Sequence, residues 1–273
     1  MTRIDRRSGV SSSLRMLRYS AAVVLGALCL GSASCDRIQK KQKEREALRE
    51  MKSSSKEVID SMEMTEDGMI VDTEKARQAQ QNLIKSGEKM GGKLGEAIKI
   101  SAEIQGKVAE AGGECAKAGD EAGHYFDMEA LSKARDYTVG IEKFRKLIAV
   151  NEEMLVTLEA FSPELMKRLD AIGFDGKGRR DFDGGFKKKW EKTYESLKVI
   201  RESDIALGKV GISLMEGLQK GDAYWSWDAE AKATNFENDA QIEWFQAQMK
   251  QVEELGEAQS KAQQNLMRHL KAP

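Results

Sequence analysis

FKKKWEKTYESLKVIRESDIALGKVGISLMEGL, residues 186–218, carries the clearest structural signal in this sequence. Apolar and small residues recur in it at alternating steps of four and three positions, and two polar residues share the pattern. The full set is Phe186, Trp190, Thr193, Leu197, Ile200, Asp204, Leu207, Gly211, Leu214 and Leu218. Such a heptad pattern is typical of a helix that packs lengthwise against another helix.

Three further segments repeat this spacing, and each predicts a helix. They span residues 83–125, 130–158 and 242–270. The chain has only two prolines, and 40% of its residues are hydrophobic but only 6% are aromatic, a composition that favours long helices over sheet. The sequence therefore predicts an all-α fold: an elongated four-helix bundle of long antiparallel helices over residues 73–273.

Polar residues mark the expected helix starts. Thr73 stands at the N-cap position of the first helix, and Asp127 stands at that of the second. Asn238 precedes Gln241 at the spacing of a capping box, so the last helix should begin there.

Three breaks are expected between the helices. The second helix should stop near Ser162–Pro163, where a short helix to about residue 172 begins. A loop rich in glycine and charge follows over residues 174–185. Residues 222–236 then form a short non-helical insert that contains Tyr224-Trp225-Ser226-Trp227.

The first predicted helix is rich in glycine, which destabilises helix interiors by roughly 1 kcal/mol each. Gly87, Gly91 and Gly95 would share one face of a continuous helix, and their missing side chains favour close approach of a neighbouring helix. The alternative is a helix that breaks near Gly112–Gly113.

The first 35 residues have the three parts of a secretory signal peptide. Five arginines come first without any lysine, an apolar run from Tyr19 to Leu30 follows, and the small residues 31–34 end at Cys35. The apolar run is too short to span a bilayer comfortably.

A cysteine directly after small residues resembles the lipobox of bacterial lipoproteins, in which the thiol is lipidated and the signal is cut just before it. The resemblance implies a lipid on Cys35 and a protein anchored in the cell membrane, facing the periplasm or the exterior. Asp36 resembles the inner-membrane retention signal of enteric bacteria. Because Ser32 stands where leucine is typical, an ordinary signal cut after Ala33 or Ser34 is the alternative.

The sequence thus divides into a signal peptide (1–34), a lipid-anchored charged stalk with a turn at residues 66–68 (35–72), and the helical domain (73–273). An aromatic insert before the last helix resembles the layout of an uncharacterised family of enteric periplasmic lipoproteins. That resemblance implies no function.

Charge and cysteine content narrow the class of partner. The signal removes five of the 44 basic and one of the 45 acidic residues, which leaves a net charge of −5 and implies no nucleic-acid binding. Cys29 leaves with the signal and Cys35 carries the lipid. Cys115 then has no disulfide partner in the chain, and we expect a buried, inert thiol.

No catalytic or metal site is predicted. Glu121 and His124 have the Glu-x-x-His spacing of di-iron bundles, but the second motif is missing because Leu266 stands three residues before His269. We expect no cofactor beyond the covalent lipid. The cluster of Met62, Met64 and Met69 leaves soft-metal binding as a minor alternative.

Several residues are candidates for binding. We call the face formed by each heptad pattern a seam. Asp204 and Asn151 lie on otherwise apolar seams, where a polar residue specifies register or partner, or contacts a ligand inside the bundle. Trp225 and Trp227 would stack on sugar rings or cap the end of the core. The third group is a basic segment with interleaved aromatic residues, suited to anionic lipid or cell-wall polymer unless its aromatics point inward; it includes Arg179, Arg180 and Lys188.

Three functions remain open. The first is a non-catalytic interaction or scaffold module that binds a protein partner or itself. The second is a carrier of an apolar molecule, sugar polymer or soft metal, with a cavity near Asp204 or beneath Trp225 and Trp227. The third is an enzyme, which requires a polar cluster around Cys115, Glu121 and His124. We expect the first.

Overall fold

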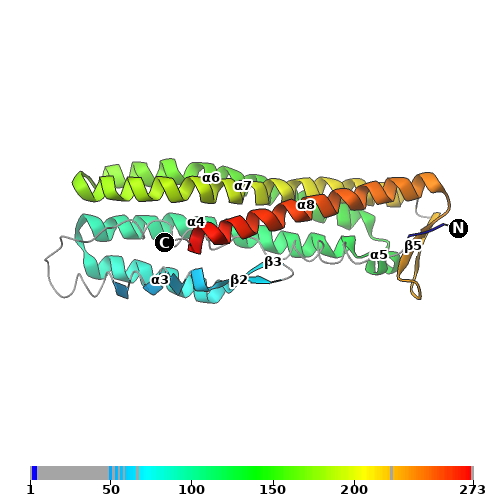
Figure 1. Ribbon diagram of the computed structural model, residues 1–273, viewed down its shortest axis with the longest axis horizontal. Coiled ribbons are helices and arrows are strands. Elements are labelled where there is room, and N and C mark those ends of the chain that lie inside the picture. The colour runs from blue at the N-terminus through cyan, green and yellow to red at the C-terminus, as the bar shows by residue number, and fades with distance from the viewer. Residues whose placement is uncertain are drawn as a thin grey trace.

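The computed structural model describes residues 2–4, 49–50, 53–54, 56–57, 59–65, 68–221 and 224–271. Long helices dominate and lie side by side along one axis, which gives the molecule the shape of a rod (Figure 1). The predicted predominance of helix, with long antiparallel packing, is confirmed.

Within the described ranges, five long helices form the rod: α3 (Thr73–Met90), α4 (Gly92–Gly123), α6 (Tyr137–Ala171), α7 (Gly176–Lys220) and α8 (Asp239–Lys271). The 3₁₀ turn η2 (His124–Phe126) and the short helix α5 (Met128–Ala134) connect α4 to α6. Each long helix packs on the next, α3 on α4, α4 on α6, α6 on α7 and α7 on α8.

Two small antiparallel hairpins accompany the helices in the part of the chain that the structure describes. The first pairs β2 (Met62–Thr65) with β3 (Gly68–Val71), brackets the turn predicted at residues 66–68, and contacts α8. The second pairs β4 (Trp225–Asp228) with β5 (Ala233–Phe236), so the aromatic insert is non-helical as predicted. β1 (Thr2–Ile4) pairs with β5 on its other edge, which gives the strand order β1-β5-β4.

The last part of the predicted stalk lies against α3. Residues 49–50, 53–54, 56–57 and 59–60 are helical. Lys89 on α3 forms an ion pair with Glu50 at 2.9 Å, and Lys75 donates to the carbonyl of Asp60 at 3.3 Å. Cys35 and the rest of the signal region, apart from β1, lie outside the described residues, as do the side chains of Met62, Met64 and Met69.

The predicted single helix over the first seam is wrong, because the chain reverses at Gly91. Gly91 and Gly92 have φ of +64° and +63°, and α3 folds back on α4. Gly87 and Gly95 meet across this reversal, where a Cβ on Gly87 would lie 2.8 Å from the carbonyl oxygen of Gly95. The expected close packing is therefore found, but between two arms of a hairpin; the alternative break at Gly112–Gly113 falls inside α4.

The second seam is also divided differently from the prediction. It is interrupted at Arg135, whose φ of +53° ends α5, and α6 then runs through Pro163 without a break. Phe161, Leu165 and Leu169 stay fully buried on one face across the proline. Their packing outweighs the roughly 3 kcal/mol that an interior proline costs a helix.

The loop predicted over residues 174–185 is instead the first turns of α7. A short connection with Gly173 at φ +63° and Gly176 at φ +70° joins α6 to α7. Phe182, Phe186 and Trp190 recur at helical spacing, and their rings stack on one another. This apolar face continues the helix through a segment whose glycines favour a loop.

The predicted helix starts are close to those observed. Asp127 accepts from the backbone N–H groups of residues 129 and 130, as expected of an N-cap. Asn238 accepts from the N–H of Gln241 at 3.0 Å. For α3 the cap is Asp72 rather than Thr73, because the Asp72 carboxylate accepts from the N–H of Lys75.

The core of the described residues consists of two apolar clusters in series along the rod. The Phe161 cluster draws on α3, α4, α6, α7 and α8 and includes Leu83, Ile104, Leu158, Phe161, Leu197 and Leu266. The Phe144 cluster lies toward the β4–β5 hairpin and includes Phe126, Phe144, Leu207, Leu214, Trp225 and Phe245. Buried polar residues separate the two clusters.

Candidate functional site

The polar layer consists of Asn151 on α6, Arg201 and Asp204 on α7, and Gln259 on α8. All four side chains are buried, Arg201 with 0% and Asp204 with 1% of its surface exposed. On α7 the layer follows Ile200 of the Phe161 cluster and precedes Leu207 of the Phe144 cluster. It therefore lies at the junction of the two clusters.

Hydrogen bonds join three helices at this level. Arg201 Nη1 donates to Asn151 Oδ1 at 3.0 Å, and Arg201 Nη2 lies 3.3 Å from Asp204 Oδ2. Gln259 Nε2 donates to Asp204 Oδ1 at 2.7 Å. The Arg201–Asn151 and Gln259–Asp204 bonds join different helices, so a slide of α6, α7 or α8 by one turn would break them, which is the property that a register-fixing role requires.

Burial governs the charge state of the layer. It raises the pKa of Asp204 to about 6, against the opposing effect of the Arg201 charge and the Gln259 hydrogen bond. At neutral pH the carboxylate is mostly ionised and balances the guanidinium. Within the described residues, Arg201 Nε and Gln259 Oε1 make no hydrogen bond, which is unfavourable for buried polar atoms.

The sequence pattern identified Asp204 and Asn151 but not Arg201. Arg201 sits one position beside the apolar seam, where a long cation is expected to reach solvent. The feature of the sequence that could have identified Arg201 is its i, i+3 spacing to Asp204 on the seam. Gln259 was counted only as a member of the last heptad pattern.

The residues of the enzyme hypothesis have separate structural partners. Glu121 accepts from Lys143 at 2.9 Å and Lys146 at 3.2 Å, and both bonds lower its pKa. Cys115 is buried and donates to the carbonyl of Val150 at 3.4 Å, and burial raises the pKa of its thiol. No group of three or more acidic, His or Cys residues in the described part of the chain is placed to hold a metal ion.

The aromatic insert closes one end of the core. Trp225 is 4% exposed, and its Nε1 donates to the Tyr137 hydroxyl at 3.0 Å. The Arg135 guanidinium lies 4.1 Å from the centre of the Trp225 ring and also donates to the Trp225 carbonyl. Trp227 packs partly buried against the same cluster. This geometry fits the capping alternative rather than sugar stacking on Trp225.

The basic segment at the start of α7 directs its aromatics inward. Phe186 and Trp190 are buried in the Phe161 cluster. Arg179 forms ion pairs of 2.6 Å with Asp170 and with Asp183, and Arg180 is exposed. The Lys188 side chain lies outside the described ones. The aromatics are thus unavailable to a lipid or polymer surface.

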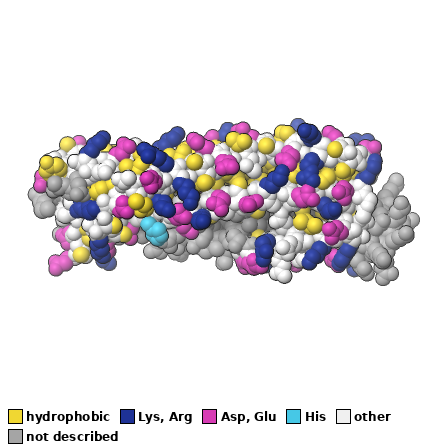
Figure 2. Space-filling model, turned by 180° about the vertical axis from the view of Figure 1, so that it is seen from behind, with side chains coloured by type: hydrophobic (Ala, Val, Ile, Leu, Met, Phe, Trp, Pro, Cys, Tyr) yellow, Lys and Arg dark blue, Asp and Glu magenta, His cyan; other side chains and the backbone are white. Residues whose placement is uncertain are grey.

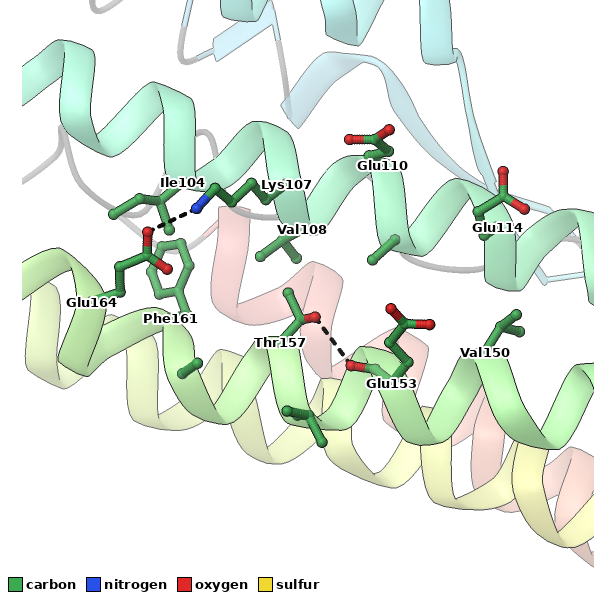
Figure 3. A pocket seen from close by; sticks show the side chains of 13 residues that line it. Ile104, Lys107, Val108, Glu110, Glu114, Val150, Glu153, Thr157, Phe161 and Glu164 are labelled. Atoms are coloured by element: carbon green, nitrogen blue, oxygen red, sulfur yellow. Dashed lines mark hydrogen bonds and ion pairs between the residues drawn. The ribbon is translucent and has the colours of Figure 1, made fainter.

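A groove of about 580 Å³ runs between α4 and α6 (Figure 3). Its inner wall is apolar and is formed by Ile104, Val108, Ala111, Val150 and Phe161. Glu153 and Glu164 point from α6 toward α4, and Glu110 and Glu114 lie along the outer edge of α4. Nothing in the sequence pattern pointed to it, since it forms between helices 50 residues apart.

No protein-family model, curated protein or solved structure matches this chain. Among the helices of the described ranges, none has the length and hydropathy that a bilayer span requires. Lys and Arg are interspersed with Asp and Glu over the face seen in Figure 2, rather than gathered by sign.

Proposed function

We propose that this chain is a membrane-anchored extracytoplasmic lipoprotein whose helical rod is a non-catalytic interaction or scaffold module of the cell envelope. The observation that carries the proposal is the N-terminal order of arginines, apolar run, small residues and Cys35. One lipid chain binds membranes weakly, so the multiply acylated terminus of a lipoprotein is what would hold the protein there.

The rod suits binding better than catalysis. The polar layer is fully buried and links helices to one another. In the finer description that we propose, α4, α6, α7 and α8 are an elongated four-helix bundle, α3 folds back on α4, and the charged stalk connects the bundle to the lipid. Partners are then the bilayer, through the lipid, and a protein or a second copy; nucleic acid is disfavoured by the net negative charge.

A ligand carrier is the alternative, and the unpaired buried atoms of Arg201 and Gln259 are the observation in its favour. The carrier should have a cavity near Asp204 or beneath Trp225 and Trp227. The groove that the structure describes lies elsewhere, and the Trp225 ring is covered by Arg135. We therefore favour the interaction module.

Cys35→Ser in the full chain tests the anchor. Cells grown with radiolabelled palmitate should label the wild-type protein and retain it in the membrane fraction. Cys35→Ser should lose the label, and the matched control Cys115→Ala should keep it because that thiol is buried. Equal labelling of Cys35→Ser, or an unlabelled wild type beginning at residue 34 or 35, would contradict the lipoprotein proposal.

A further inference from the structure

The α4–α6 groove combines an apolar wall with an unusually exposed apolar side chain. Ile104, Val108 and Phe161 form the buried part of its wall. Val156 stands at its edge and is 65% exposed, more than any other large apolar side chain of the described residues. Val156 thus extends the apolar surface of the groove out to solvent.

Ion pairs cross the α4–α6 interface on both sides of the groove centre. At one end Arg168 pairs with Glu103 and Lys107 with Glu164, at 2.5 and 2.8 Å. At the other end Lys143 and Lys146 pair with Glu121.

The groove centre breaks this pattern. Glu110, Glu114 and Glu153 line it, all three are exposed, and none forms an ion pair with another described residue. Three carboxylates thus flank an apolar wall, and the one cation among the lining residues, Lys107, is already paired with Glu164. Their mutual repulsion is relieved by a positively charged partner.

We propose that this groove is the docking site for a basic amphipathic helix of a protein partner. Apolar anchors at i, i+3, i+4 and i+7 would lie on the wall and on Val156, with Lys or Arg on the flanks beside Glu110, Glu114 and Glu153. The groove spans residues 104–114 of α4 and 150–164 of α6, about 15–20 Å at 1.5 Å per residue. A partner helix of about 10–14 residues matches that length.

Charge selects this occupant over others. Nucleic acid and anionic lipid carry the same sign as the groove carboxylates and are repelled. A second copy would present the same acidic surface in a two-fold contact, which also places like charges together. This inference rests on the proposed function only for the location of the partner, which is the cell envelope.

A pair of synthetic peptides tests the docking site on the full-length protein in zwitterionic lipid nanodiscs, with empty nanodiscs as background. Both peptides are 14-residue helices with Leu at the anchor positions and a photo-crosslinker at one Leu; one carries Lys at the remaining positions and the other Glu. The Lys peptide should bind and crosslink to residues of α4 and α6, and the Glu peptide should not.

Charge-reversal variants make the test specific. Glu110→Lys/Glu114→Lys/Glu153→Lys should weaken binding of the Lys peptide by about tenfold or more. The matched control, Glu216→Lys/Glu243→Lys/Glu257→Lys, makes the same charge change at exposed positions of α7 and α8 and should leave binding within about twofold of wild type.

A second pair isolates the apolar anchor. Val156→Ser should weaken the Lys peptide about threefold, whereas Val199→Ser, at a 41% exposed valine of α7, should have no effect. Because both side chains are exposed, neither variant threatens the fold.

Absence of Lys-peptide binding, equal binding of the two peptides, or equal loss in the control triple variant would overturn the docking site. A crosslink between two copies through α4–α6 would assign the groove to self-association instead. Palmitate labelling of Cys35 is read independently, so failure of the anchor and failure of the groove are distinguishable.

Discussion

Gly211 on α7 faces the ring of Phe144 on α6, and the contact has no room for a side chain. A Cβ at residue 211 would lie 2.5 Å from Phe144 Cζ, and Phe144 is fully buried. Gly113 on α4 is the opposite case, since a Cβ there meets no atom within 4 Å. The packing of the helices therefore requires glycine at residue 211 but not at residue 113.

Alanine substitution should separate these two roles. Gly211→Ala should lower the free energy of unfolding by about 1–3 kcal/mol because the ring of Phe144 must move. Gly113→Ala should raise it by about 0.5–1 kcal/mol because alanine favours helix and restricts the unfolded chain. Urea unfolding of both variants measures the difference, and equal effects would show that the contact with Phe144 is not tight.

Asp204 should make stability depend on pH in an unusual direction. Its pKa of about 6 in the folded protein exceeds its ordinary value of 3.8, so between pH 4 and 6 the folded state binds more protons than the unfolded state. This group therefore adds stability as the pH falls and removes it as the pH rises.

The Asp204→Asn variant isolates that contribution, since the other carboxylates, Glu121 among them, titrate equally in both proteins. The free energy of unfolding of the wild type, minus that of Asp204→Asn, should increase by up to about 3 kcal/mol from pH 7 to pH 4. Urea titrations at four pH values measure it. A difference that stays constant or decreases would show that Asp204 titrates near its ordinary pKa in the folded protein.

At the scale of helices and turns, the sequence correctly predicted the features that depend only on the spacing of nearby residues, namely helical seams and N-caps. The heptad seams of α7 and α8 and the caps at Asp127 and Asn238 were read correctly. The reversal at Gly91 was missed because the seam continues in phase on both sides of it. Pro163 and the glycines near residue 176 suggested breaks that tertiary packing overrides.

The buried ion pair between Arg201 and Asp204 on α7 predicts non-additive substitutions within the polar layer. Arg201→Met should cost about 3–5 kcal/mol of unfolding free energy because it leaves Asp204 buried without its counter-charge. Arg201→Met/Asp204→Leu should recover most of that loss, since an apolar pair of similar volume avoids the desolvation penalty.

A double-mutant cycle on Arg201 and Asp204, followed by chemical unfolding, measures the coupling. If the double variant is as unstable as the sum of the single ones, the pair does not interact as the geometry indicates. Recovered stability together with altered packing between α6 and α7, seen by amide exchange, would support a role in helix register.

At the scale of the whole molecule, the membrane anchor is predicted by the sequence, whereas the groove is found only in the structure. The order of residues 1–35 predicts the membrane anchor, and it lies largely outside the described residues. The groove could not be foreseen, because its wall and its carboxylates come from α4 and α6 and become neighbours only after folding. Arg201 was not predicted for the same reason, since its hydrogen-bond partner Asn151 lies on another helix, α6.

Native mass spectrometry of the protein purified from its own membranes tests the central claim, a lipid-tethered interaction module, most directly. The account predicts a chain that begins at Cys35, carries the added mass of a diacyl or triacyl modification, and retains a bound polypeptide. An unmodified terminus at residue 34 or 35, or a bound small molecule or metal in place of a polypeptide, would contradict it.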